Sequence, residues 1–113
     1  MHNGSVADEI KYPYREQGNR LRLLRLAEKR GSGVAFAKFL GWGQSGYSQF
    51  ETGARMVPAD KARQLARVIP GFDPLWLWEG RREHLGFDLR RRIEEQEDRE
   101  RGSGSPRNER QNV

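Results

Sequence analysis

The segment that best predicts the fold of this chain is Leu40-Gly41-Trp42-Gly43-Gln44-Ser45-Gly46-Tyr47-Ser48-Gln49-Phe50-Glu51-Thr52-Gly53. Glycine readily adopts the left-handed backbone conformation that ends helices, so Gly41 and Gly53 mark two helix ends. Residues 44–51 lie between them, and their only apolar side chains, Tyr47 and Phe50, have helical spacing. The segment therefore predicts a short helix that follows a tight glycine turn.

A second short helix is predicted immediately before this turn, over residues 33–40. Ser32 is a favourable N-cap residue, and Phe36, Ala37 and Leu40 supply an apolar face. The glycine at position 41 ends this helix, and we expect it at positive φ.

The helix expected before this pair covers residues 19–30. Leu21 and Leu24 form its apolar stripe, and arginines occupy the other side. Gly31 is its expected stop.

Two helices are expected after the central segment. One covers residues 59–68, and the other is short, with Asp73 as its cap and Pro74 at its first position. We interpret Trp76 or Trp78 as a core residue that closes a small bundle, in preference to a stacking platform for single strands built from both.

These features divide the chain into four parts. Residues 1–17 are a predicted flexible arm, 18–80 the folded domain, 81–101 a charged helical extension and 102–113 a disordered tail. An apolar stripe in the extension has two open interpretations, docking on its own domain or a dimer contact; its residues are Leu85, Leu89 and Ile93.

The positive charge is concentrated in the predicted domain. The 113 residues carry a net charge of +5. Residues 18–80 hold ten Lys or Arg against five Asp or Glu, which gives +5, whereas the parts before and after them contribute −1 and +1. A basic folded unit favours a polyanionic partner.

The composition excludes several classes of protein and site. The chain has no Cys and only two His, so disulfides, thiolate metal sites and His-rich metal sites are not expected. There is no catalytic constellation, and Gly41 to Gly46 fit G-x-G-x-x-G without the strand that a dinucleotide site needs. No apolar run approaches the roughly 18 residues of a membrane span. We expect a soluble, cytoplasmic protein that is not an enzyme and needs no cofactor or metal.

The predicted helix 44–51 has an unusual outer face. Amides and hydroxyls occupy it where a purely solvated helix would carry Lys and Glu. Gln pairs bidentately with adenine in the major groove, and Ser serves either base. Gly46 lowers helix stability by about 1 kcal/mol relative to Ala, which favours the close approach of another molecule at this point.

This segment resembles the helix-turn-helix of the Cro/C1-type (XRE-like) DNA-binding family. The pattern from Leu40 to Gly53 is supported by Leu21, Leu24 and Arg25 before it and by Leu-Trp-Leu-Trp-Glu-Gly at residues 75–80 after it. The resemblance covers about residues 18–80. It implies an all-α, five-helix, lambda-repressor-like domain that binds double-stranded DNA as a transcriptional regulator. A homodimer that reads a palindromic operator is the family habit.

The resemblance also implies a set of DNA contacts. The helix 44–51 corresponds to the recognition helix, whose base-facing positions are Gln44, Ser45, Ser48 and Gln49. The implied phosphate contacts are Ser32, Gly33, Lys38, Thr52 and Arg55. The chain departs from the family at Gly33, because the family usually has there a Gln that touches the DNA backbone and braces the recognition helix.

That departure leaves a second function open. The alternative is a protein-binding module on the same fold, an anti-activator or antitoxin with a regulatory protein partner and with DNA binding weakened or lost. A basic rim around Gln44 and Gln49 favours DNA. An exposed apolar patch built from Phe39, Trp42 or Trp78 favours a protein partner.

Overall fold

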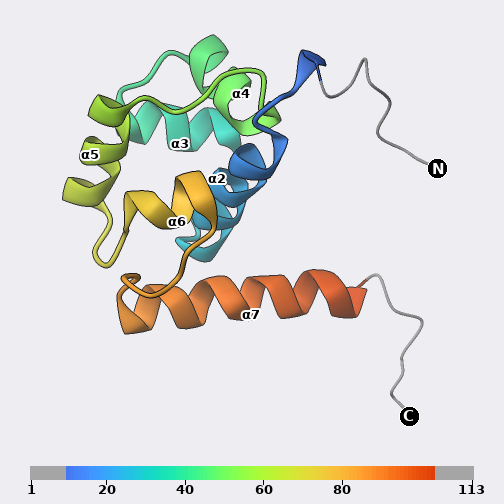
Figure 1. The fold of residues 1–113 in the computed structure, drawn as a ribbon, viewed down its shortest axis with the longest axis vertical. Coiled ribbons are helices and arrows are strands. Elements are labelled where there is room, and N and C mark those ends of the chain that lie inside the picture. The colour runs from blue at the N-terminus through green and yellow to red at the C-terminus, as the bar shows by residue number, and fades with distance from the viewer. Residues whose placement is uncertain (1–9, 104–113) are drawn as a thin grey trace.

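A computed structural model describes residues 10–103, which form helices and turns without a strand (Figure 1). The predicted all-α class is confirmed. The helices are α2 (Arg15–Ala27), α3 (Gly33–Leu40), α4 (Gln44–Thr52), α5 (Ala59–Val68), α6 (Pro74–Glu79) and α7 (Phe87–Ser103). The segments 1–9 and 104–113 lie outside the described residues, and with them most of the predicted arm and tail.

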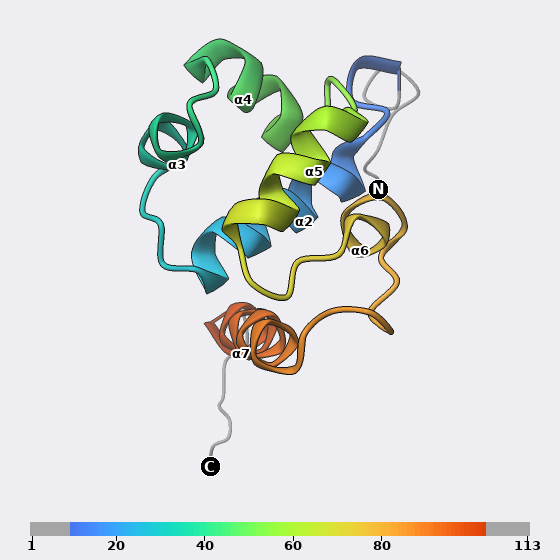
Figure 2. The same ribbon diagram turned by 90° about the vertical axis from the view of Figure 1, so that its left-hand side faces the viewer.

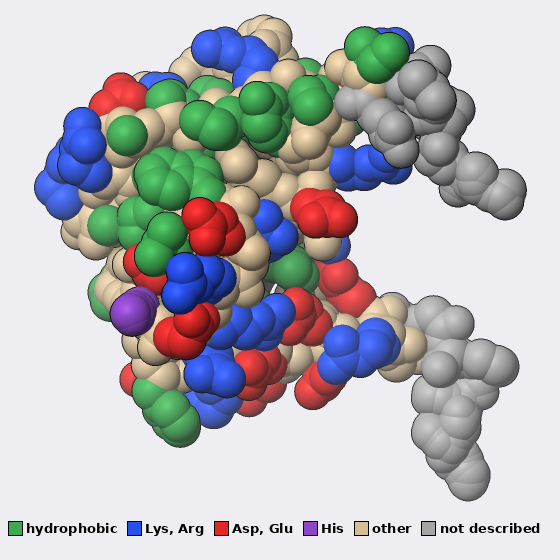
Figure 3. Space-filling view, viewed as in Figure 1, with side chains coloured by type: hydrophobic (Ala, Val, Ile, Leu, Met, Phe, Trp, Pro, Cys, Tyr) green, Lys and Arg blue, Asp and Glu red, His purple; other side chains and the backbone are tan. Residues whose placement is uncertain are grey.

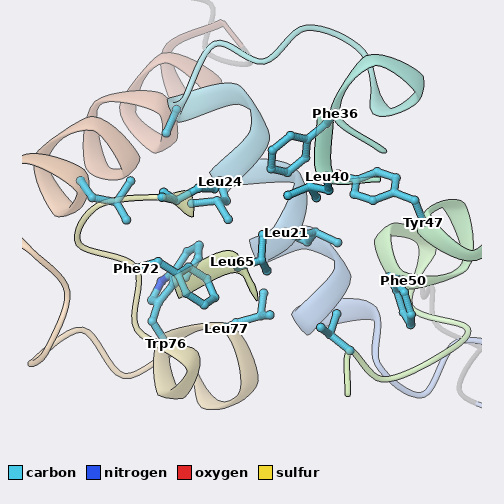
Figure 4. Close-up of a cluster of buried hydrophobic side chains, with 14 of the residues drawn as sticks. Leu21, Leu24, Phe36, Leu40, Tyr47, Phe50, Leu65, Phe72, Trp76 and Leu77 are labelled. Atoms are coloured by element: carbon cyan, nitrogen blue, oxygen red, sulfur yellow. The ribbon is translucent and has the colours of Figure 1, made fainter. Parts of the chain in front are cut away.

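Helix α2 is the centre of the packing. It contacts α3, α4, α6 and α7, and α7 runs beneath the rest of the bundle in both ribbon views (Figures 1 and 2). One continuous apolar core lies between these helices (Figure 4). The labelled core side chains are Leu21, Leu24, Phe36, Leu40, Tyr47, Phe50, Leu65, Phe72, Trp76 and Leu77.

The start and end of α2 differ from the sequence prediction of 19–30. The helix begins at Arg15, because the chain before it is tied to α4: the Tyr14 N–H donates to the Gly53 carbonyl oxygen at 2.9 Å. Gln17 is buried, and its Oε1 accepts from the Val57 N–H at 2.7 Å. The helix ends at Ala27, three residues early, since Lys29 already has a positive φ of 55°. Residues 15–17 therefore belong to a helix and not to the arm.

Glycine allows α2 to cross α4 closely. A Cβ on Gly18 would lie 2.3 Å from the Glu51 carbonyl oxygen and 2.8 Å from the Phe50 carbonyl oxygen, distances that no side chain tolerates. The crossing fixes the C-terminal half of α4 against the first turns of α2.

The predicted helix over residues 33–40 is confirmed. The Ser32 hydroxyl accepts from the Ala35 N–H at 3.1 Å, and Gly41 has the expected positive φ of 75°. Helix α4 extends one residue beyond the predicted 44–51 and ends at Gly53, whose φ is 92°.

The predicted helices after α4 are also present. Helix α5 has the predicted bounds 59–68. Helix α6 has Pro74 at its first position, but the Asp73 side chain makes no capping hydrogen bond, so the predicted cap is only positional. Trp76 is fully buried, which confirms its core role, whereas Trp78 is half-buried with its Nε1 donating to the Val57 carbonyl oxygen at 2.9 Å.

The stripe of α7 docks on its own domain. Leu89 and Ile93 are buried against the bundle together with Leu85 at the start of the extension. Ion pairs flank this contact at N···O distances of 2.6–2.7 Å, and acidic and basic side chains mix along the exposed part of α7 (Figure 3). These pairs are Arg22–Glu100, Arg82–Glu97 and Arg92–Glu28. These pairs are only partly shielded from solvent, where ion pairs contribute little, so the apolar stripe supplies most of the docking energy.

Two kinds of feature are missing from the described part of the chain. Within residues 10–103, no helix is both long enough and apolar enough to cross a membrane. The same residues contain no group of three His, Cys, Asp or Glu side chains that could hold a metal ion.

Candidate nucleic-acid interface

The turn before α4 is held from beneath by a tryptophan. Trp42 is buried, and its backbone N–H donates to the Ala37 carbonyl oxygen at 2.9 Å. Its indole N–H donates to Gln64 Oε1 at 2.8 Å, and Gln64 Nε2 donates to the Leu40 carbonyl oxygen at 2.6 Å. Gln64 of α5 therefore fixes both the end of α3 and the start of α4. Sequence reasoning missed it, because a glutamine on an amphipathic helix gives no local signal of such a role.

Aromatic contacts fix the buried face of α4. The Tyr47 ring meets the Phe36 ring edge-on with 5.8 Å between centroids (Figure 4). The Phe50 ring meets Trp42 at the same centroid distance in a T-shaped arrangement. Such edge-to-face pairs add about 0.5–1.5 kcal/mol beyond burial. Tyr47 and Phe50 thus hold the helix as the sequence predicted.

An ion pair braces α4 against α2. Arg25 forms two hydrogen bonds to the Glu51 carboxylate, Nη2 to Oε1 at 2.8 Å and Nε to Oε2 at 3.0 Å. Its Nη1 also donates to the Gly31 carbonyl oxygen at 2.6 Å, and the Tyr47 hydroxyl donates to Glu51. The hydrogen bond to Glu51 raises the pKa of Arg25, and burial raises the pKa of Tyr47. The four groups link α2, the loop before α3, and α4.

This brace was not predicted from the sequence. Both partners are visible in the sequence as an arginine at position 25 and an acidic residue at position 51. They are 26 residues apart, however, and no local pattern indicates that they pair. A Cβ on Gly33 would lie 3.3 Å from Tyr47 Cε2, so the tyrosine ring occupies the space beside the first residue of α3. In this chain Tyr47, Glu51 and Arg25 hold the helix where the family pattern uses a glutamine.

The outer face of α4 carries only neutral hydrogen-bonding side chains. Gln44, Ser45 and Ser48 are exposed and Gln49 is half-exposed. The one charged residue of the helix is Glu51, which is already paired with Arg25. Within the described residues, none of the four polar side chains has a hydrogen-bond partner, so all four are available to another molecule.

A hollow of about 290 Å³ lies between the start of α3 and α4. It brings together three of the predicted phosphate contacts, Ser32, Gly33 and Thr52, with Gln44 and Ser48 of the outer face. The first N–H groups of a helix have no intrahelical acceptor, and they favour anions. The Ser32 hydroxyl takes one of them, the Ala35 N–H. The hollow therefore offers the Ser32 hydroxyl and backbone N–H groups beside the base-facing residues. The Thr52 hydroxyl already donates to the Gln49 carbonyl oxygen at 3.2 Å, and the Glu51 carboxylate, paired with Arg25, also lines the hollow.

The two predicted cationic contacts lie outside this hollow. Lys38 is exposed in the last turn of α3. Arg55 follows α4, where its guanidinium lies 5.5 Å from the centroid of the Phe50 ring. A further cation, Lys61, lies 4.9 Å from the Trp42 ring centroid. None of the three forms an ion pair within residues 10–103, and sequence reasoning had not singled out Lys61.

Comparison with known proteins gives one match. A family model described as a helix-turn-helix domain matches residues 16–73, which comprise α3, the turn and α4 with most of α2 and all of α5. No curated protein and no solved structure matches the chain. The match ends just before α6, so both α6 and α7 lie outside the matched residues.

Proposed function

The chain belongs to the Cro/C1-type helix-turn-helix family, and on that premise we propose that it is a sequence-specific transcriptional regulator of double-stranded DNA. The observation that carries this proposal is the outer face of α4. A rigidly braced helix presents amides and hydroxyls without internal partners, and it carries no unpaired charge of either sign.

In the proposed complex α4 lies in the major groove. Gln44, Ser45, Ser48 and Gln49 contact base edges, where the bidentate amide of Gln favours adenine. The brace from Arg25 to Glu51 supports this role, because it limits the motion of α4 before DNA arrives.

Phosphate contacts position the protein on the duplex. Ser32, Gly33 and Thr52 line the hollow beside α4, which is a suitable place for one phosphate group. Lys38, in the last turn of α3, and Arg55, just after α4, are exposed cations. Neutralised phosphates release counterions, so binding is expected to weaken steeply as salt is raised.

We further propose that two copies act together in the cytoplasm on a palindromic operator. Two recognition helices about 34 Å apart place one α4 in each of two successive major grooves. The support for a dimer is that members of this family typically bind DNA as dimers. The apolar stripe of α7 adds no support, because it is buried against its own chain.

The alternative, an anti-activator or antitoxin, is not favoured by the structure. An exposed apolar patch built from Phe39, Trp42 or Trp78 would favour that alternative. Trp42 is buried, and Trp78 is half-buried and hydrogen-bonded to Val57. Phe39 alone of the three is exposed, at 47%, and the Arg30 guanidinium lies over its ring, 4.0 Å from the centroid.

Capture of sheared genomic DNA tests the proposal. The purified protein is mixed with DNA at about 150 mM salt, where the Debye length is about 8 Å, and the retained fragments are sequenced. We expect one enriched palindromic motif that disappears with the double variant Gln44→Ala/Gln49→Ala. The double variant Arg91→Ala/Glu95→Ala, which removes an exposed ion pair on α7, is the matched control and keeps the motif. Absence of any enriched motif with the wild-type protein contradicts the proposal.

A further inference from the structure

One residue of the recognition helix has no role within the folded chain. Gly46 lies inside α4, where glycine is less favourable than alanine. Other glycines have structural reasons: Gly18 permits a close helix crossing, and Gly53 has a positive φ. Gly46 has neither, because its φ is not positive and a Cβ there would have no neighbouring heavy atom within 4 Å.

Gly46 borders the reading face of α4. It lies three residues before Gln49 of the outer face and four residues before the buried Phe50, at the edge between the two faces. Residues three apart on a helix are surface neighbours. The missing Cβ therefore leaves a recess next to the Gln49 side chain, at the edge of the surface that is proposed to face bases.

We infer that Gly46 is a specificity-determining residue that admits the C5-methyl group of a thymine in the major groove. This inference rests on the proposed function. The thymine methyl is the apolar group that projects from a base edge into the major groove, and it identifies one base of the four. A helix position without Cβ lets the methyl approach the backbone of α4 in van der Waals contact, whereas any side chain there fills the same space.

Removal of single thymine methyl groups from the operator tests this inference. Each thymine of the captured operator half-site is replaced in turn by deoxyuridine, which lacks only the methyl, and affinities are measured by fluorescence anisotropy. The wild-type protein is expected to bind one of these substituted duplexes about fourfold more weakly, because one methyl contact is lost. Other substitutions leave the affinity unchanged.

Gly46→Ala adds a methyl group to the protein at the point where the thymine methyl group is proposed to lie. This variant is expected to bind the thymine operator at least about fivefold more weakly than wild type, because two methyl groups compete for one space. The deoxyuridine duplex restores its affinity, so the preference at that position reverses. The melting temperature of the variant is expected to rise by about 2–8 °C, which separates a binding defect from a folding defect.

Gly102→Ala is the matched control. Gly102 lies in α7, a Cβ there also has no heavy atom within 4 Å, and the same chemical change leaves the base preference unaltered. The inference is overturned if Gly46→Ala binds the thymine and deoxyuridine duplexes with the same affinities as the wild-type protein. The reference in this experiment is Gln49→Ala, which is expected to lose base discrimination on the same operator. That result leaves the proposed function intact. If the wild-type protein captures no specific duplex, the proposed function and the inference about Gly46 are both wrong.

Discussion

Replacing Gly18 with alanine adds a single methyl group at the crossing of α2 and α4. The new Cβ would lie 2.3 Å from the Glu51 carbonyl oxygen, and real Cβ contacts of this kind are longer than 3.0 Å. The opposing atoms belong to the backbone of α4 and cannot rotate away. The helices must therefore separate by at least about 0.7 Å, the difference between these two distances.

The expected cost follows from two opposing terms. Overpacking of this size typically costs about 1–3 kcal/mol, and more where backbone must move. Alanine recovers about 0.5–1 kcal/mol of helix stability relative to glycine. We expect a net loss of about 2 kcal/mol of unfolding free energy, which corresponds to a melting temperature lower by roughly 8–16 °C for a domain of this size.

Thermal unfolding followed by far-ultraviolet circular dichroism measures this loss. Gly46→Ala is the matched control, since it makes the same change in open space on α4 and is expected to raise the melting temperature. If Gly18→Ala melts at or above the wild-type temperature, the close crossing described above is wrong.

Three further predictions concern the brace and the extension. Glu51→Gln leaves the partly buried Arg25 guanidinium without its charge partner and is expected to cost about 1–3 kcal/mol in chemical denaturation. A loss below about 0.5 kcal/mol argues against the brace. The hydrogen bond from Arg22 lowers the pKa of Glu100 to about 2, below the usual value of about 4.3. The pair therefore stabilises the fold at pH values above about 4.3, and this contribution is lost as the pH falls toward 2. Glu100→Gln is therefore expected to show its stability deficit at neutral pH and to lose it in acid; a deficit independent of pH excludes this linkage. Leu89→Ala removes a buried side chain of α7 and is expected to cost about 2–5 kcal/mol by urea denaturation, and a near-neutral effect means that α7 does not dock.

Local signals were sufficient to predict the helix-turn-helix from the sequence. Ser32 as a cap, Gly41 and Gly53 at positive φ, and the spacing of Tyr47 and Phe50 all act within a few residues of each other. These signals set helix ends wherever the rest of the chain packs, which is why α3 has the predicted bounds and α4 ends one residue beyond the prediction.

The remaining features depend on contacts between distant parts of the chain. The start of α2 depends on the hydrogen bond from the Tyr14 N–H to Gly53 and on Gln17, which accepts a hydrogen bond from Val57, 40 residues away. The brace joins Arg25 to Glu51, and Gln64 of α5 reaches the turn at Trp42. A single sequence does not reveal which polar side chains will meet across the core. The DNA contacts stay predictions, because the structure gives the positions of these side chains and no bound duplex.

The reading role of α4 is tested best by base discrimination at single positions. Anisotropy titrations at about 150 mM salt compare the captured operator with every single-base variant of one half-site, for the wild-type protein, Gln49→Ala and the control Arg91→Ala/Glu95→Ala. We predict that Gln49→Ala loses about 1–3 kcal/mol of discrimination at one base pair and keeps it at the others. Equal weakening on all sequences would show that Gln49 does not read a base, and a wild-type protein without base discrimination would contradict a sequence-specific role for α4.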